Sequence, residues 1–370
     1  MASPPRSILV VSLRYFGDLL LTTPLIRSLR RGFDAAAIDV LLIAGTEGIL
    51  EGNPDVRDVL TIAERPTGRA HLALLRRLWR RYDLAVVAET GDRPHLYGLV
   101  AARQRAGLLP REFGKRWWKQ PSLRHAVTFA AQEPRVDAYR RLAQAMALPY
   151  APEVVAPTAG HAAPAWAARL GFDPGREAYA VLHLAPRFRY KRWHADGWRS
   201  LIAWLDARGL RLAVTGGSEP GERDYVAQVL AGCAAPVVDL SGALRFAEAA
   251  DLLRGAKLYV GPDTATSHLA AACGTPAVVL FGPTDPRLWG PIPRAGLDPP
   301  YEKVAPCQRR ANVTLLQEDS LACVPCQQEG CDRHRDSRSE CLDRMDAGRV
   351  IAAARAAIEA SPAGVPKAAP

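Results

Sequence analysis

The sequence predicts an α/β protein with two doubly wound, Rossmann-like halves, each a parallel sheet covered by helices on both faces. Short apolar runs alternate with helical patterns from the first residues to about residue 281. The alternation forms two series, separated by an Ala- and Pro-rich stretch over 149–164 that is typical of a linker. At roughly 150 residues per domain, the 370 residues suffice for two hydrophobic cores.

The first series predicts the elements of the N-terminal half. Its first strand is expected at Ile8–Leu13, and a helical pattern follows through Leu19, Leu20, Ile26 and Leu29. Further strands are expected at Ile38–Ile43, Val56–Ile62 and Asp83–Ala88, with a helix at His71–Arg81. Because strands buried on both faces form continuous apolar runs, these strands are expected to be parallel.

The second series predicts the elements of the C-terminal half. Its strands are expected at Ala178–Leu184, Leu210–Thr215, Val237–Leu240, Lys257–Val260 and Ala277–Phe281. We therefore expect domains at 1–160 and 161–345, the second with a Cys-rich segment at 307–341. A C-terminal helix and a disordered tail are expected over 346–370. Ligands of doubly wound sheets bind outside the carboxyl ends of the strands, so the two halves are expected to face a central crevice.

The composition is ordinary for a soluble globular protein, with 48% hydrophobic and 23% charged residues. No apolar run approaches the ~20 residues of a membrane-spanning helix, and the N-terminus lacks the pattern of a signal peptide. We therefore expect a cytoplasmic protein. Its net charge of +10 favours anionic partners such as nucleotide phosphates, nucleic acid or an acidic membrane surface.

The stretch VGPDTATSHLAAAC, residues 260–273, places polar side chains between a strand and a helix. Asp263 and Thr264 precede the helix, whose N-terminal N–H groups and dipole favour phosphate binding. His268 follows Thr264 by one helical turn. A second polar turn, FGPTDP at 281–286, follows the next strand. The alternative is a helix capped by Asp263 or Thr264 that carries one incidental histidine.

Three further turns after strands carry candidate functional residues. In RFRYKRW, residues 187–193, Lys191 is suited to neutralise a diphosphate, although a solvated basic loop is the alternative. In TGGSEPGE, residues 215–222, Glu219 is suited to accept hydrogen bonds from ribose hydroxyls. In RYFGDLLLTTP, residues 14–24, Asp18 is a candidate general base or, alternatively, an acid that stabilises a helix N-terminus.

Taken together, these motifs resemble glycosyltransferase family 9, the bacterial heptosyltransferases that transfer heptose from ADP-heptose to the lipopolysaccharide inner core. The matching signatures are FGDLLLTTPLIRSLR, KRW at 191–193, TGGSE, LSGALRFAEAADLLRGAKLYVGPDTATSHLAAACGTP and FGPTDPRLWGP. They span residues 8 to about 291. RYFGDLLLTTP, IDVLLIAGTEGILEGNP and the tryptophan of FGPTDPRLWGP are most similar to the heptosyltransferase III type.

The resemblance implies a GT-B fold and an inverting transfer that needs no metal or other cofactor. It implies that Asp18 is the base, Lys191 neutralises the diphosphate, and Glu219 binds the ribose. The remaining donor-binding residues that it implies are Arg187, Leu244 near the adenine, Asp263, Thr264, Ala265 and His268. The sequence departs at Ala265, where many relatives have glycine, and at Pro186 and Arg187, where some have hydroxyl residues. The alternatives are another nucleotide sugar used for a different surface glycan, or a non-catalytic glycan-binding module.

Residues 103–125 carry seven basic side chains and one acid, interleaved with Phe113, Trp117 and Trp118. We expect phosphorylated or acidic core sugars of the acceptor to meet the basic residues of this stretch, which are Arg103, Arg105, Arg111, Lys115, Arg116, Lys119 and Arg124. Of these, Arg103, Arg116 and Lys119 are the expected acceptor-binding residues. The tryptophans are suited to a membrane interface, so a peripheral position at the cytoplasmic face of the inner membrane is expected. An ordinary exposed loop is the alternative. Stacking on nucleic-acid bases is disfavoured, because no RNA-binding module accompanies these residues.

Four of the seven cysteines form the pattern Cys323-x2-Cys326-x4-Cys331-x9-Cys341, with Cys307 upstream. Four thiolates can hold zinc tetrahedrally, and the C-x2-C half is typical of such sites. The alternative is unliganded or partly paired thiols. A metal ion here would be structural, because the cysteines lie beyond the turns that carry the candidate chemistry.

Overall fold

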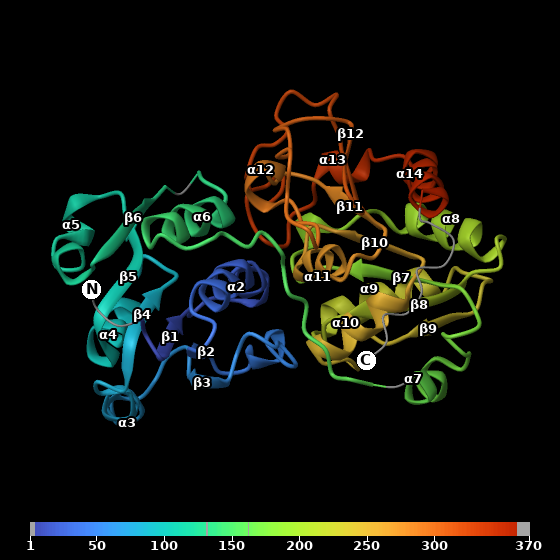
Figure 1. Cartoon of the computed structure of the whole chain (residues 1–370). Helices are drawn as coiled ribbons and strands as arrows, with labels where there is room; N and C mark the ends of the chain where they lie inside the picture. Colours follow the sequence, from blue (N-terminus) through green and yellow to red (C-terminus); the bar gives the residue numbers. More distant parts are fainter. Residues whose placement is uncertain (1–3, 131, 162, 361–370) are drawn as a thin grey trace. The chain divides into compact units, whose positions relative to one another are not determined.

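The structure, a computed structural model, describes residues 4–130, 132–161 and 163–360 (Figure 1). The chain divides into two compact units, Met1–Pro157 and Thr158–Pro370. Each unit is built on one sheet with parallel strands and flanking helices, which confirms the predicted doubly wound α/β class. The expected disordered tail falls largely on residues 361–370, outside the described part of the chain. No described helix is long and apolar enough to cross a membrane.

The first unit contains a six-stranded sheet in which every neighbouring pair is parallel. The strands are β1 (Ser7–Val11), β2 (Ala37–Ile43), β3 (Asp58–Ile62), β4 (Tyr82–Val87), β5 (Ala102–Pro110) and β6 (His125–Phe129). Their order is β3-β2-β1-β4-β5-β6, so the direction of winding reverses between β1 and β4. Such a reversal is where open α/β sheets bind ligands.

Helices cover both faces of this sheet (Figure 1). They are α1 (Phe16–Leu20), α2 (Thr23–Gly32), α3 (Gly68–Leu78), α4 (Asp92–Ala101), α5 (Phe113–Arg116), α6 (Arg135–Ala145) and the short η1 (Glu47–Ile49) and η2 (Gln120–Ser122). On one face, Leu9 and Val11 share a core with Leu78 of α3 and Tyr97 of α4. On the other, α2 and α6 pack against each other. Alternate residues of β1 thus serve two different cores, as its continuous apolar run predicts.

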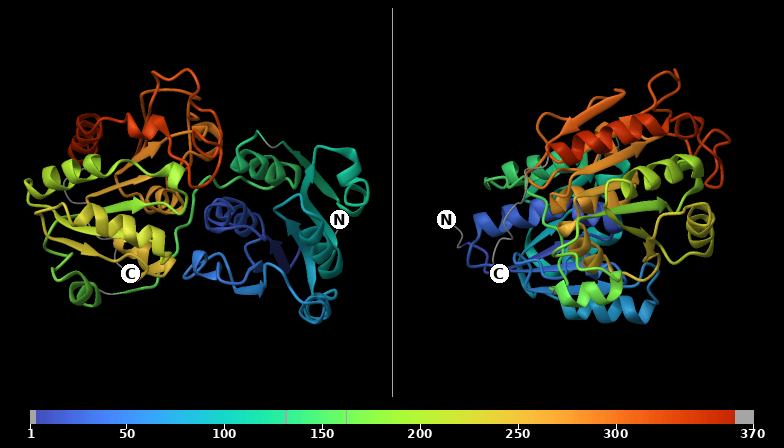
Figure 2. Two further views of the ribbon diagram at one scale, coloured as in Figure 1. Left: turned by 180° about the vertical axis from the view of Figure 1, so that it is seen from behind. Right: turned by 90° about the vertical axis from the view of Figure 1, so that its right-hand side faces the viewer.

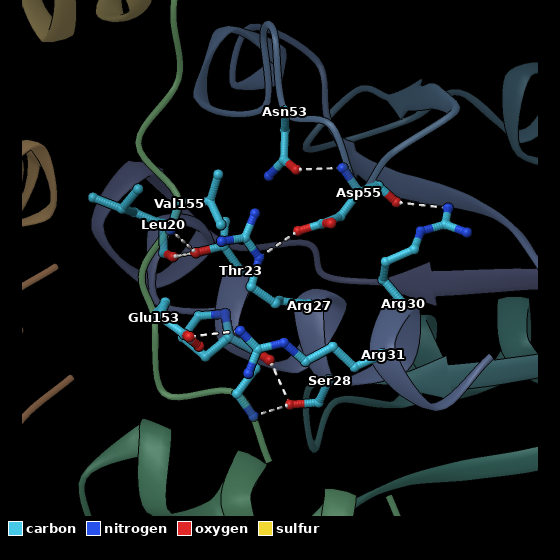
Figure 3. A network of polar contacts seen from close by, with 12 residues as sticks. Leu20, Thr23, Arg27, Ser28, Arg30, Arg31, Asn53, Asp55, Glu153 and Val155 are labelled. Carbon is cyan, nitrogen blue, oxygen red and sulfur yellow. Dashed lines mark hydrogen bonds and ion pairs between the residues drawn. The ribbon is translucent and has the colours of Figure 1, made fainter. Parts of the chain in front are cut away.

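Helix α2 anchors the end of the first unit (Figure 3). Three of its side chains bind residues 151–155. The hydroxyl oxygens of Ser28 and Thr23 accept hydrogen bonds from Ala151 N and Val155 N, each at 2.9 Å. Arg31 donates to Glu153 Oε1 at 2.6 Å. Beyond the boundary, Asp251 accepts hydrogen bonds from Thr158 Oγ1 at 2.7 Å and Ala159 N at 3.0 Å. The predicted linker is therefore shorter than 149–164, because polar side chains of each unit bind its backbone.

The second unit contains a seven-stranded sheet of order β12-β13-β11-β10-β7-β8-β9. Its strands are β7 (Tyr179–Ala185), β8 (Arg211–Gly216), β9 (Val237–Asp239), β10 (Leu258–Pro262), β11 (Ala277–Phe281), β12 (Cys307–Arg310) and β13 (Val313–Gln317). All neighbouring pairs are parallel except β12–β13. The order reverses between β7 and β10, and the turns after these two strands carry the predicted donor residues.

The helices of the second unit again lie on both faces of the sheet. They are α7 (Ala163–Leu170), η3 (Arg189–Lys191), α8 (Ala195–Asp206), α9 (Pro220–Leu230), α10 (Phe246–Gly255), α11 (Ala265–Cys273), α12 (Pro286–Trp289), α13 (Glu340–Asp343) and α14 (Ala347–Glu359). Helices α8 and α14 lie side by side and share a core with α9 and the sheet (Figure 2). Helices α10 and α11 form a second pair.

Candidate active site

Asp18 lies in α1, immediately after β1 at the reversal of the first sheet. Two arginines hold its carboxylate, with Arg14 Nε 3.0 Å from Oδ2 and Arg135 Nε 3.1 Å from Oδ1. The side chain is 17% exposed, so a substrate hydroxyl can reach it. Each carboxylate oxygen has a second lone pair, which leaves an acceptor for that hydroxyl.

A second carboxyl, Glu89, follows β4 on the other side of the same reversal. It is buried and accepts a hydrogen bond from the Leu13 backbone N–H. Burial raises the pKa of Glu89, opposed by that hydrogen bond and by the charges of Arg14 and Arg135. Glu89 and Arg135 could not be predicted from the sequence, because both come from segments far along the chain without a local motif.

The structure does not bring the three predicted acceptor residues together. Lys119 is buried, where its Nζ donates to Thr90 O at 2.7 Å and pairs with Asp92 at 2.8 Å. The guanidinium of Arg116 lies over the Phe113 ring at 6.0 Å from its centroid. Arg103 is exposed at the amino end of β5, whereas Asp18 lies at the carboxyl edge of the sheet.

Residues 103–125 do not form a simple exposed loop, because they include most of β5 together with α5 and η2. Residues 106–110 of β5 are buried, so this strand belongs to the core despite its basic beginning. Trp118 is half-buried, with its ring 6.3 Å from the His95 ring. The exposed aromatic side chains of α5 and its C-cap are instead Phe113 and Trp117.

In the second unit, Lys191 and Asp263 form an ion pair across the reversal between β7 and β10. Lys191 Nζ lies 2.7 Å from Asp263 Oδ2 and 3.1 Å from Asp263 O. Thr284, in the turn after β11, donates to the same Oδ2 at 2.8 Å. Turns after three neighbouring strands thus meet at Asp263, as the sequence predicted for two of the polar turns.

Helix α11 begins directly beside this ion pair. Thr264 is its N-cap residue but makes no side-chain capping hydrogen bond, so the capping alternative does not hold for this residue. Ala265 is helical and its φ is not positive, so the turn does not require the glycine found in many relatives. Ser267 fixes the turn by donating to Pro262 O at 2.5 Å. The first-turn N–H groups of α11 are therefore suited to bind phosphate.

Two histidines lie near this edge of the second sheet. His268 is buried in α11, one turn after Thr264. His183 was not among the predicted residues, although a histidine within the apolar strand AVLHL indicates a buried polar group. Its Nδ1 lies 3.2 Å from Thr215 Oγ1. Burial lowers the pKa of His183 to about 4, so its imidazole is neutral at pH 7.

The other predicted donor residues lie on separate loops of the second unit. Glu219 is exposed at the N-cap of α9, whereas the unpredicted Glu222 is buried and accepts from Gly217 N at 2.9 Å. Burial raises the pKa of Glu222. Arg187 is exposed, with its guanidinium 5.8 Å from the Phe188 ring centroid. Leu244 is half-buried between β9 and α10.

The Cys-rich segment, residues 307–341, supports the turns that carry Lys191 and Thr284. Ser339 Oγ donates to Tyr190 O at 2.6 Å, and Arg189 N donates to Arg335 O at 3.1 Å. On the second turn, Gln327 N donates to Pro283 O at 2.7 Å. This segment therefore positions two of the three turns that meet at Asp263.

The cysteines of this segment differ in exposure. Cys341 is buried, and burial together with the nearby Cys326 and Cys331 thiols raises its pKa to about 12. Cys323 and Cys331 are exposed, and all seven cysteines are free thiols. Over the residues that the structure describes, no three His, Cys, Asp or Glu side chains are arranged to hold a metal ion.

The sequence and the fold both match known proteins. Residues 72–328 match the sequence profile of Glycosyltransferase family 9 (heptosyltransferase). Lipopolysaccharide heptosyltransferase 3 of Escherichia coli is 30% identical over 291 residues, which cover 75% of this chain and 84% of that protein.

Solved structures with similar folds include ADP-heptose lps heptosyltransferase II of E. coli, with a TM-score of 0.72 and 19% identity over 95% of this chain and 98% of that chain. E. coli heptosyltransferase WaaC with ADP-2-deoxy-2-fluoro heptose has a TM-score of 0.63 and 22% identity, over 85% of this chain and 93% of that chain. These likenesses cover both units and confirm the expected GT-B fold.

Proposed function

This chain belongs to glycosyltransferase family 9, and from that premise we propose that it transfers heptose from ADP-heptose to the inner core of lipopolysaccharide. The observation that carries the proposal is the Lys191–Asp263–Thr284 cluster at the start of α11. A cation, a hydroxyl and free helix N–H groups at one sheet edge are suited to hold a nucleoside diphosphate.

In the proposed reaction, the acceptor hydroxyl attacks the anomeric carbon of the donor sugar. A new C–O bond forms as the bond between the anomeric carbon and the β-phosphate oxygen breaks, and ADP leaves with the electron pair. Asp18 takes the proton of the attacking hydroxyl. Attack opposite the leaving ADP inverts the anomeric configuration. Arg14 and Arg135 hold the carboxylate in place during this step.

The leaving group needs stabilisation because negative charge develops on the β-phosphate. Lys191 can exchange its Asp263 partner for that phosphate, while the first-turn N–H groups of α11 donate to its oxygens. Glu219 and Leu244 remain our proposed contacts for the ribose and adenine, and Arg187 and His268 for the donor's phosphates and sugar.

Since protein cations supply the countercharge, we propose that transfer needs no metal ion. Full activity after treatment with EDTA is the expected result, and a loss restored by added Mg²⁺ would contradict it.

Calorimetric titration of ADP-heptose, a UDP-sugar and a GDP-sugar, paired with transfer assays, tests the donor assignment. We expect binding and transfer only with ADP-heptose. Transfer from a UDP- or GDP-sugar would assign another donor and a different surface glycan. Binding of glycan by a folded protein that binds no nucleotide would identify a non-catalytic glycan-binding module.

We also propose that the protein works as a peripheral enzyme at the cytoplasmic face of the inner membrane. Phe113 and Trp117 are 70% and 63% exposed, beside Lys115 and Arg116 on α5. Aromatic and basic side chains together are suited to an anionic membrane interface, where a lipid-linked acceptor is presented. We propose no nucleic-acid partner.

A structural zinc ion at Cys323, Cys326, Cys331 and Cys341 is a separate proposal. It rests on the cysteine spacing and on the proximity of Cys326 and Cys331 to Cys341. Metal analysis of protein purified without chelators tests it. We expect one zinc ion per wild-type chain and none in Cys341→Ser. Active protein that contains no metal would refute the proposal.

A further inference from the structure

Glu89 is a buried carboxyl close to Asp18 that has no part in the proposed reaction. Its side chain accepts a hydrogen bond from the Leu13 backbone N–H. Leu13 directly precedes Arg14, whose guanidinium binds the Asp18 carboxylate at 3.0 Å. Glu89 therefore holds the end of the first strand, where the turn that carries the candidate base begins.

Side chains of two helices fix the place of Glu89 relative to the base. The His95 ring of α4 has its Nε2 3.1 Å from Glu89 O. On the other side, Tyr139 OH of α6 donates to the carbonyl of the preceding residue at 3.3 Å, and it lies 3.2 Å from Thr22 Oγ1. Thr22 in turn donates to Asp18 O at 3.0 Å. The two carboxyl groups are thus held in one hydrogen-bonded framework.

Four charged side chains gather in this framework. Arg14 and Arg135 both bind Asp18, so two positive charges surround one carboxylate. In the described part of the chain Glu89 forms no ion pair of its own, but the charges of both arginines act on it. When both carboxyl groups are ionised, two negative charges balance two positive ones.

The other titratable groups that pack around Glu89 are uncharged at pH 7. Burial lowers the pKa of His95 below its ordinary value of 6.5, so the imidazole is neutral. Burial also raises the pKa of Tyr139, so the phenol keeps its proton. The charge around Asp18 is therefore set by the two arginines and Glu89.

We propose that Glu89, as a carboxylate, is a positioning residue of the transfer that favours proton uptake by Asp18. In that step the O–H bond of the attacking hydroxyl breaks and a new O–H bond forms on Asp18. The electron pair left on the hydroxyl oxygen forms the bond to the anomeric carbon. Asp18 thereby loses its charge, which Arg14 and Arg135 oppose, whereas Glu89 remains negative and offsets both arginines. The proposal rests on the proposed function, because the proton comes from the acceptor of that enzyme.

Glu89→Gln tests the proposal, because it keeps the size of the side chain and an acceptor for Leu13 N–H but removes the charge. The single-turnover rate of transfer is measured in the full-length chain with saturating donor and acceptor. We expect it to be about 10- to 100-fold slower than in the wild type at pH 8, with the Kd for ADP-heptose within twofold. Asp83→Asn is the matched control, because the exposed Asp83 accepts from Ser7 N at 3.0 Å at the opposite end of β4. It should react like the wild type.

The pH dependence separates a charge effect from a structural one. As the pH is lowered from 8 to 5, Glu89 takes up a proton, and burial makes this happen above its usual pKa of 4.5. The wild type should then slow towards the rate of Glu89→Gln, so the ratio of the two rates should shrink. Glu89→Asp, which keeps the charge, should retain this dependence on pH and a rate within ~5-fold of the wild type. Glu89→Gln should slow Asp18→Asn no further, because Glu89 acts through that base.

A rate ratio that is the same at every pH would overturn the proposal, as would a Glu89→Asp protein that is as slow as Glu89→Gln. The second comparison decides the matter even where Glu89→Gln does not fold. ADP binding and Tm show whether each variant is folded, because the proposed ADP site lies in the other unit. Transfer from a UDP- or GDP-sugar alone would refute the proposed donor, and the same rate ratios measured with that sugar would still test Glu89. A wild type that transfers from no donor would refute both proposals.

Discussion

Asp18, held by Arg14 and Arg135, is the proposed general base of the transfer. Replacing it in Asp18→Asn keeps the size of the side chain but removes the acceptor for the proton. We expect kcat to fall about 10²- to 10⁴-fold, with the Kd for ADP-heptose within twofold of the wild type. Steady-state transfer and calorimetry measure these quantities. Asp58→Asn, which changes an exposed aspartate on β3, should leave both unchanged. Turnover near that of the wild type in Asp18→Asn would assign the base to another group.

Lys191 and Asp263 form an internal ion pair in the absence of a donor. Lys191→Gln removes the charge that would bind the diphosphate, and it leaves Asp263 buried without its cation. We expect ADP to bind about 10- to 100-fold more weakly by calorimetry, because a charge-assisted hydrogen bond contributes ~1.5–3 kcal/mol. Lys257→Gln, at the exposed amino end of β10, is the control. Unchanged ADP affinity in Lys191→Gln would remove Lys191 from the donor site.

His183 gives the second unit a pH-dependent stability. Its pKa is about 4 in the folded protein, against 6.5 for a free histidine. Below pH 6.5 the unfolded chain takes up a proton that the folded chain does not, so the free energy of unfolding falls by ~1.4 kcal/mol per pH unit until about pH 4. Between pH 7 and pH 5 the wild type should therefore lose ~2 kcal/mol more than His183→Gln in urea unfolding. His334→Gln, an exposed histidine, should follow the wild type. Parallel losses in all three proteins would contradict a neutral buried His183.

Several of these residues could be predicted from sequence because each stands in a motif directly after a strand. Asp18, Lys191 and Asp263 were found in this way, and the structure places all three at a sheet reversal. Arg135 and Glu89 could not be found, because the fold brings them to Asp18 from distant segments. Sequence alone also could not separate the exposed Glu219 from the buried Glu222 three residues later, since burial depends on how α9 packs.

Among the elements, the Cys-rich segment is hydrogen-bonded to the turns that carry Lys191 and Thr284, the proposed donor-binding turns. In Ser339→Ala, Tyr190 O loses its hydrogen bond and the turn of Lys191 loses one support. We expect a 3- to 10-fold increase in the Kd for ADP, in line with ~1 kcal/mol for a hydrogen bond. Ser339→Thr should restore the affinity, because it keeps the hydroxyl. Ser200→Ala removes a similar hydrogen bond on the surface of α8 and should not alter ADP binding. A lower Tm without any change in Kd would indicate that Ser339 only stabilises the fold.

Most strands could be predicted because their apolar runs are continuous. The run Ala277–Phe281 coincides with β11, and Ile38–Ile43 differs from β2 by one residue. Strand β5 was missed because Arg103 and Arg105 interrupt its beginning, and the basic pattern of 103–125 obscured the buried residues that follow. Strands β12 and β13 lie past the last predicted run, where the alternation with helices had ended.

For the whole molecule, the net charge of +10 and the exposed Trp117 lead to a prediction about membranes. The chain should bind vesicles with anionic lipid more strongly at 50 mM than at 500 mM salt, because salt screens the attraction between exposed charges. Sedimentation with vesicles of phosphatidylglycerol and phosphatidylcholine measures this. Trp117→Ala should reduce binding, whereas Trp79→Ala, which removes an equally exposed tryptophan after α3, should not. Equal effects of the two variants would argue against α5 as the membrane contact.

The hydrogen bonds on either side of the unit boundary have a consequence for proteolysis. The first unit binds the chain at Val155, and the second binds it at Thr158. Proline at 157 has its φ angle fixed near −65°. Proteases cleave preferentially at exposed, weakly held segments. The segment 151–159 should therefore resist limited proteolysis, although it joins two compact units.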